Sequence, residues 1–197
     1  LPRLSQCHIN SILLAALSAA CQPWLSEGAF CVGLEGHGRI PLFDDVDLSR
    51  TVGWFTSYYP VLLPAPVADN YQAATAIDQH LAQHPHDGLA YGVIRYLHPQ
   101  GETLQIAPPV SFNYLGRFDQ GDAADTLVQP LFDPAHAGQA SGEQGQQGER
   151  RHLLDITGLV INDQLVFHWE YGRHCHFHHT IAAMADRFVQ HLRQMIV

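Results

Sequence analysis

The sequence predicts an α/β fold, a mixed-sheet layered sandwich in which helices pack against one β-sheet. Apolar residues recur at helical spacing near both ends of the chain, over about residues 9–20 and 180–196. Shorter apolar runs between these helices have the length of strands, and within residues 164–171 large apolar side chains occupy every second position from Leu165. With 197 residues, 46% of them hydrophobic, the chain is long enough to bury one sizeable core.

Three helices are predicted from their apolar faces. The first covers residues 9–20 and ends at Pro23. The second runs over about 69–83, with Asp69 as its N-cap, since a carboxylate there can accept a free backbone N–H. The last runs over about 180–196 and presents a continuous apolar stripe that is typical of core packing.

The strands are predicted from apolar and alternating runs, and the last two form an antiparallel hairpin around Asn162-Asp163. The segment Pro64–Pro66 interrupts the second run. Residues 119–150 contain few core-forming residues, so we expect a mobile loop there. The predicted strands are 29–34, 51–63, 91–97, 110–115, 152–161 and 164–171.

The charged turn Glu35-Gly36-His37-Gly38-Arg39 follows the first predicted strand. Its two glycines let the backbone take conformations that are closed to other residues and let it approach a ligand closely. If the strand alternation continues at its frayed end, Glu35, His37 and Arg39 point to one side. The sequence therefore predicts that a carboxylate, an imidazole and a guanidinium share a small space.

Four segments resemble, in order, the signature motifs of the epimerization domains of nonribosomal peptide synthetases. They are EGHGR from Glu35, DLSRTVGWFTSYYPVLL from Asp47, GLAYGVIRYL from Gly88 and FNYLGRFD from Phe112. GLAYG is weak alone, but EGHGR followed by SRTVGWFTS is highly specific, and the resemblance covers nearly the whole chain. It implies cofactor-free inversion of the α-carbon of an aminoacyl or peptidyl thioester carried on phosphopantetheine.

The resemblance also implies which residues act. Inversion needs a base on one face of the α-carbon, a proton donor on the other, and stabilisation of the enolate oxygen. Glu35 matches one acid/base group, and Arg39 and Tyr114 match positions linked to activity. Asn113 is expected to bond the enolate oxygen or the arm, although adjacent strand residues such as Asn113 and Tyr114 point to opposite faces unless Gly116 bends the strand.

A tunnel for the phosphopantetheine arm is a further implication of the resemblance. His37 and the aromatic run after Gly53 are expected to line it, with two hydroxyl groups as hydrogen-bond partners for the pantetheine amides. Without the resemblance, the same run would be interpreted as a strand packing a core. The tunnel residues in that run are Trp54, Phe55, Thr56 and Ser57.

The implied fold is one lobe of a chloramphenicol-acetyltransferase-like fold, in which two similar lobes face each other across a tunnel. Family members carry a His-His-x-x-x-Asp motif in the first lobe, whereas His178-His179 is followed by Thr, Ile, Ala and Ala. We therefore expect residues 1–197 to be the second lobe, inactive alone, with the first lobe and a peptidyl carrier protein as partners. No cofactor of its own is implied.

One residue departs from the motif. The family usually continues EGHGR with a second glutamate, where this chain has Ile40. If that carboxylate tunes Glu35, activity is lower or altered here. The rival functions are a condensation domain of the same fold, which joins two carrier-bound amino acids, and a non-catalytic lobe that docks a carrier protein.

Composition excludes several function classes. A net charge of −9 argues against a nucleic-acid surface. All ten basic residues are arginines, so a P-loop and a pyridoxal-phosphate Schiff base are excluded, because each needs a lysine. The apolar runs are too short and interrupted for a membrane span, and we expect a cytoplasmic protein.

Cysteine, aspartate and histidine clusters have simple interpretations. The four cysteines show no metal spacing, and three lie in or beside apolar segments, which suits reduced, buried thiols. The alternative is a two-thiol racemase, which needs two cysteines facing each other across a site. The aspartates at 44, 45 and 47 are interpreted as a solvated loop in which one pairs with Arg50, the alternative being contact with a carrier protein. No metal site is predicted from them, nor from the histidines at 174, 176, 178 and 179.

Overall fold

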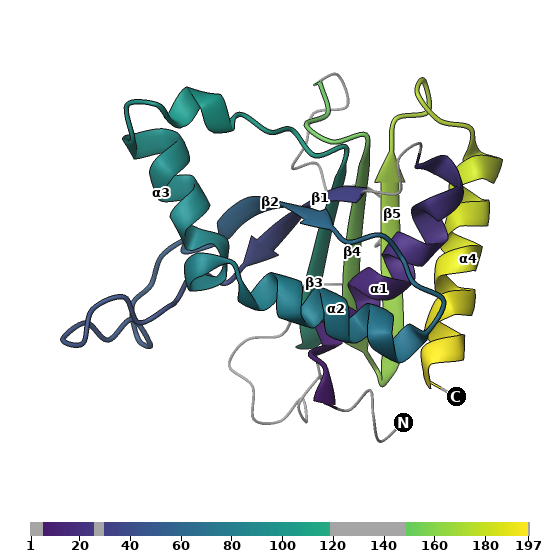
Figure 1. The fold of residues 1–197 in the computed structure, drawn as a ribbon, viewed down its shortest axis with the longest axis horizontal. Coiled ribbons are helices and arrows are strands. Elements are labelled where there is room, and N and C mark those ends of the chain that lie inside the picture. The colour runs from purple at the N-terminus through teal and green to yellow at the C-terminus, as the bar shows by residue number, and fades with distance from the viewer. Residues whose placement is uncertain (1–5, 26–29, 119–148, 197) are drawn as a thin grey trace.

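A computed structural model describes residues 6–25, 30–118 and 149–196 of the chain. Five strands form one mixed sheet in the order β2-β1-β3-β4-β5 (Figure 1). β1 pairs antiparallel with β2 and parallel with β3, β3 pairs parallel with β4, and β4 and β5 form a hairpin. The strands are β1 (Phe30–Gly36), β2 (Ser57–Leu63), β3 (Val110–Phe118), β4 (Leu154–Ile161) and β5 (Gln164–Tyr171).

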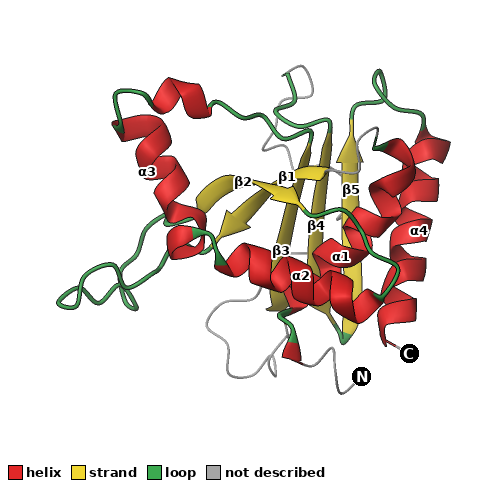
Figure 2. Ribbon diagram, in the orientation of Figure 1, coloured by secondary structure: helices red, strands yellow, loops and turns green. Residues whose placement is uncertain are grey.

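Three of the four α-helices in these residues cover one face of the sheet (Figure 2). They are α1 (Ile9–Cys21), α2 (Asn70–Ala82) and α4 (His178–Ile196), with α1 between the other two. The fourth, α3 (Leu89–Leu97), stands apart from them and contacts β2. The mixed-sheet layered fold predicted from the sequence is therefore confirmed.

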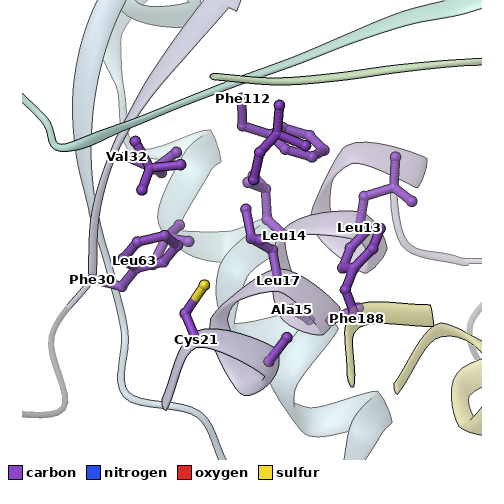
Figure 3. Close-up of a cluster of buried hydrophobic side chains, with 14 of the residues drawn as sticks. Leu13, Leu14, Ala15, Leu17, Cys21, Phe30, Val32, Leu63, Phe112 and Phe188 are labelled. Atoms are coloured by element: carbon purple, nitrogen blue, oxygen red, sulfur yellow. The ribbon is translucent and has the colours of Figure 1, made fainter. Parts of the chain in front are cut away.

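The core lies between the sheet and the helices α1, α2 and α4. Leu13, Leu14 and Leu17 of α1 are buried and lie among side chains from the strands and from α4 (Figure 3). Strand residues of even number on β1 and β3, such as Val32 and Phe112, supply the sheet side of the core. Because successive side chains alternate across a sheet, the odd-numbered residues of these strands face away from the helices.

Local sequence signals set several element ends. The Asp69 side chain accepts a hydrogen bond from the backbone N–H of Gln72 at 2.7 Å, which confirms the predicted N-cap of α2. The predicted hairpin turn is also confirmed. Asn162 and Asp163 have φ of 50° and 59°, the left-handed pair that a two-residue hairpin loop needs to match the strand twist.

Two predicted strands are wrong. Residues 91–97 lie in helix α3, because a short apolar run rich in aromatic and β-branched residues cannot be assigned from periodicity alone. The run 51–63 becomes a strand only at Ser57, and Trp54 in the preceding loop is 92% exposed. Most of the predicted mobile loop, residues 119–148, lies outside the described residues.

Two 3₁₀ turns flank α3 and a third follows α1. They are η2 (Gln22–Trp24), η3 (Pro85–Gly88) and η4 (Gly101–Leu104). Gly88, at the join of η3 and α3, has φ of 80°, and a Cβ there would lie 2.1 Å from the Tyr59 ring. Of the helices in the described part of the chain, none is long and apolar enough to cross a membrane.

Candidate functional site

A row of polar side chains crosses all five strands on the sheet face opposite the core. Its members are register neighbours, so each lies beside the next on the same face. We call this set the polar row. From β2 to β5 it consists of Tyr58, Glu35, Asn113, Thr157 and His168.

Glu35 and Asn113 form the centre of the polar row. The Asn113 Nδ2 group donates a hydrogen bond to Glu35 Oε2 at 2.6 Å. β1 and β3 are parallel and are paired through Leu34 and Phe112, which brings the next residue of each strand together. Glu35 is exposed and Asn113 is half-buried, so the carboxylate is held by an amide donor and remains open to a substrate.

Tyr114 lies on the other face of the sheet. It alternates with Asn113 along β3 and packs against the buried cluster. Gly116 does take φ of 82°, and the β3–β4 register shifts between Tyr114 and Arg117, but this bulge follows Tyr114 in the chain. The structure therefore brings Asn113, and not Tyr114, to Glu35.

Arg39 binds the loop that follows it and not the Glu35 carboxylate. We call residues 37–56 the β1–β2 loop, which projects from the sheet at the left of Figure 1. The Arg39 guanidinium donates to the Leu48 carbonyl at 2.7 Å and the Gly53 carbonyl at 3.5 Å, and lies 4.3 Å from the Phe55 ring centroid. These contacts lie within the β1–β2 loop, and the link of Arg39 to activity stays a prediction.

A glycine turn explains why the alternation beyond Glu35 is broken. β1 ends at Gly36, and Gly38 takes φ of 64°. A Cβ at position 38 would lie 1.6 Å from the Phe55 carbonyl oxygen, so only glycine fits there. The chain turns at this point, so strand alternation does not continue to Arg39, and a shared space for Glu35, His37 and Arg39 stays a prediction.

The expected tunnel residues are dispersed. His37 is exposed and its Nδ1 accepts the backbone N–H of Arg39 at 3.0 Å, while Trp54 and Thr56 are exposed in the β1–β2 loop. Phe55 is half-buried beneath the Arg39 guanidinium. Ser57 is buried on the core side of β2, with its hydroxyl against Gly36. Their contact with a phosphopantetheine arm stays a prediction.

Tyr58 and His152 form a second polar pair beside Glu35. His152 Nε2 lies 3.4 Å from the Tyr58 hydroxyl, and His152 Nδ1 lies 2.8 Å from the Pro108 carbonyl. Arg151 stands over the Tyr58 ring at 4.5 Å from its centroid. Burial raises the pKa of Tyr58 to about 12, with a smaller opposing effect of Arg151.

Sequence reasoning missed Tyr58, Thr157, His168 and His152. Alternation alone puts Thr157 and His168 on one face of the predicted hairpin. Which other strands share that face depends on the strand order, and no local pattern determines that order. Tyr58 could have been selected as a candidate, because it belongs to a motif that carries the resemblance. Its position opposite Glu35 could not be predicted, because that depends on the register between β1 and β2.

No metal centre is formed by the described residues, in which no group of three histidine, cysteine, aspartate or glutamate side chains is close enough to hold an ion. Asp47 accepts the backbone N–H of Ser49 at 2.9 Å, which lowers its pKa. Within the β1–β2 loop, all of which the structure describes, Arg50 makes no ion pair with the aspartates at 44, 45 and 47. The expected pairing is therefore wrong, and the loop remains a solvated one.

The geometry of the polar row suits proton transfer. A carboxylate can take a proton from carbon or return one, and the amide beside it fixes which oxygen points outward. The second N–H of the Asn113 amide is a donor that can reach an oxygen atom of a bound molecule. Both groups stand on strands, which hold them more rigidly than loops do.

Comparison with known proteins identifies the chain's relatives. The Condensation domain family model matches residues 2–197. Chondramide synthase cmdD of Chondromyces crocatus is 37% identical over 197 residues, which cover 98% of this chain and 5% of that protein. Surfactin synthase subunit 2 of Bacillus subtilis (strain 168) is 35% identical over 189 residues, covering 96% of this chain and 5% of that protein. The chain thus spans only a small part of these relatives.

Solved structures show the same fold. The epimerization domain from the third module of tyrocidine synthetase B superposes with a TM-score of 0.77 and 30% identity, over 98% of this chain and 42% of that one. A structure concerning condensation domain-mediated chain release from the enacyloxin polyketide synthase superposes with a TM-score of 0.63 and 16% identity, over 98% and 37%. The extent of the family match and the identity to these relatives lead to one conclusion: this chain belongs to the Condensation domain family.

Proposed function

We propose that the chain is the second lobe of an epimerization domain, which inverts the α-carbon of an aminoacyl or peptidyl thioester on a carrier protein. The observation that carries the proposal is the Glu35–Asn113 pair, which stands on the open sheet face within the EGHGR and FNYLGR motifs. The likeness to the tyrocidine synthetase epimerization domain supports it.

In the proposed reaction, Glu35 removes the α-proton. The Cα–H bond breaks, the proton goes to a carboxylate oxygen, and the electron pair moves to the thioester oxygen as an enolate. The free N–H of the Asn113 amide donates to that oxygen and stabilises the developing charge. A group on the remaining part of the domain then delivers a proton to the opposite face, and the thioester is restored with inverted configuration.

The test is Glu35→Gln in the full-length domain with an aminoacyl thioester on its carrier protein. Glutamine keeps the size and the hydrogen-bonding shape but cannot take a proton, so we expect epimerization to fall by about 10²- to 10⁴-fold. Exchange of the α-proton with solvent deuterium and chiral analysis of the released acid measure it. Glu170→Gln is the matched control, because Glu170 is an exposed carboxylate on the same sheet face.

Full activity of a folded Glu35→Gln domain would overturn the proposed role. Condensation is the second candidate, because the family model that matches carries that name. It predicts a new peptide bond between two carrier-bound amino acids with configuration retained. Binding of the carrier protein by the complete domain, with neither deuterium exchange nor peptide formation, would indicate a docking role instead.

A further inference from the structure

The Tyr58 ring lies across β1 next to Glu35. Tyr58 is the register partner of Glu35, and directly opposed residues in an antiparallel pair have Cβ atoms about 4.5–5.5 Å apart. The ring leans toward Gly33, two residues before Glu35 on the same face. A Cβ at Gly33 would lie 2.0 Å from the Tyr58 hydroxyl oxygen, so the ring occupies the space that a side chain would take.

His152 holds the far end of this ring. Its Nδ1 donates to the Pro108 carbonyl, because a carbonyl can only accept, which leaves Nε2 of the neutral ring as an acceptor for the Tyr58 O–H. His152 is 7% exposed and Pro108 is fully buried, so both are fixed by packing. The tyrosine is thereby tied to the segment before β3, the strand that carries Asn113.

The hydroxyl remains a donor at physiological pH. Burial raises the pKa of Tyr58 to about 12, and the Arg151 guanidinium stacked on the ring only partly offsets this. A neutral O–H that donates to His152 keeps the ring in one orientation over Gly33. The Tyr58 ring thus crosses β1, and its hydroxyl contact with His152 links β2 to the segments that precede β3 and β4.

We infer that Tyr58, tied to His152, is a positioning residue that fills the face of β1 on the Gly33 side of Glu35 and so directs the carboxylate toward Asn113. The ring fills the space over Gly33 on this face, so the Glu35 side chain is kept from leaning that way, and its carboxylate contacts Asn113 of β3. The expected effect on kinetics rests on the proposed function. The position of the Glu35 side chain can be determined in the domain without any turnover.

Kinetic measurements on the full-length domain give the first test. Tyr58→Phe removes the tie to His152, and Gly33→Ala displaces the ring without changing Tyr58, His152 or Glu35. A misplaced carboxylate slows proton abstraction, so we expect kcat for α-proton exchange to fall about tenfold or more in both variants while KM stays nearly constant. Tyr59→Phe is the matched control, since it removes a hydroxyl from the core side of the same strand, and it should leave kcat unchanged.

Crystal structures of the wild-type and Tyr58→Phe domains give the second test, which needs no turnover. We expect the Glu35 carboxylate to leave Asn113 or to occupy two orientations in the variant. Retention of the 2.6 Å contact would overturn the inference, as would an unchanged kcat in folded Tyr58→Phe. If the wild-type domain shows no exchange at all, the proposed function fails, while the structural comparison still decides the role of Tyr58.

Discussion

Arg39 holds the β1–β2 loop closed on itself. Replacing it by alanine removes two charge-assisted hydrogen bonds and the contact with the Phe55 ring, which together are worth about 1–3 kcal/mol at a half-buried site. We expect amide hydrogen exchange over residues 40–56 to become at least about fivefold faster in Arg39→Ala. Mass spectrometry of exchanged peptides measures this.

The matched variant is Arg39→Lys. It keeps the positive charge but lacks the planar fork that reaches two carbonyl groups, so its loop should exchange at an intermediate rate. An unchanged exchange rate in Arg39→Ala would show that the loop is held by other contacts. If exchange does become faster, a loss of activity in either variant is attributed to loop order and not to direct contact with Glu35.

The sequence was most informative at positions with strict local requirements. Gly36 and Gly38 marked the turn after Glu35, and the structure shows why position 38 accepts nothing larger. The arrangement beyond that turn could not be predicted, because a single left-handed residue redirects the chain. The role of Tyr58 could not be predicted either, because it depends on the register between β1 and β2, which local sequence patterns do not specify.

At the scale of elements, α3 offers a matched pair of glycines. Gly92 lies in the interior of the helix, and a Cβ there would meet nothing within 4 Å. Gly92→Ala should therefore raise the free energy of unfolding by about 0.5–1 kcal/mol, because alanine loses less conformational entropy on folding. Urea denaturation measures the change.

Gly88→Ala should do the opposite. The position has φ of 80° and the new methyl group would overlap the Tyr59 ring, so we expect a loss of more than about 1 kcal/mol in the free energy of unfolding. Equal effects of the two substitutions would contradict the assignment of 89–97 as a helix that begins directly after Gly88. The pair thus tests the one element whose class the sequence misassigned.

Helices with long periodic faces and the hairpin with its Asn-Asp turn were predicted within a few residues of their bounds. Both signals are local, because a helix face repeats within one turn and the turn residues must tolerate positive φ. Strand β2 and helix α3 were predicted less well. Each is short and apolar, and its class is decided by packing against distant parts of the chain.

For the whole molecule, burial of the Cys21 thiol predicts that the free energy of unfolding decreases at alkaline pH. Burial raises the pKa of Cys21 from 9.0 to about 12, so between these values the folded state holds a proton that the unfolded chain has released. The contribution to stability is complete below pH 9 and is lost as the pH rises toward 12. The slope approaches about 1.4 kcal/mol per pH unit for this one group.

Urea denaturation at pH 8 and pH 10.5 measures this slope. Cys21→Ala should be less stable than the wild type at pH 8, because it loses the packing against Met184, but its stability should fall less between the two pH values. Cys175→Ala is the control, since that thiol is exposed. Equal slopes in the wild type and Cys21→Ala would contradict the assigned burial of the thiol.

The parallel pairing of β1 with β3 has a consequence for biosynthesis. Glu35 and Asn113 are 78 residues apart, and β2, α2 and α3 are made between them. A nascent polypeptide that has emerged from the ribosome only as far as α3 contains Glu35 but not yet Asn113. Translation must therefore proceed beyond residue 113 before the two groups can meet, so the Glu35–Asn113 pair cannot form while β3 is still unmade.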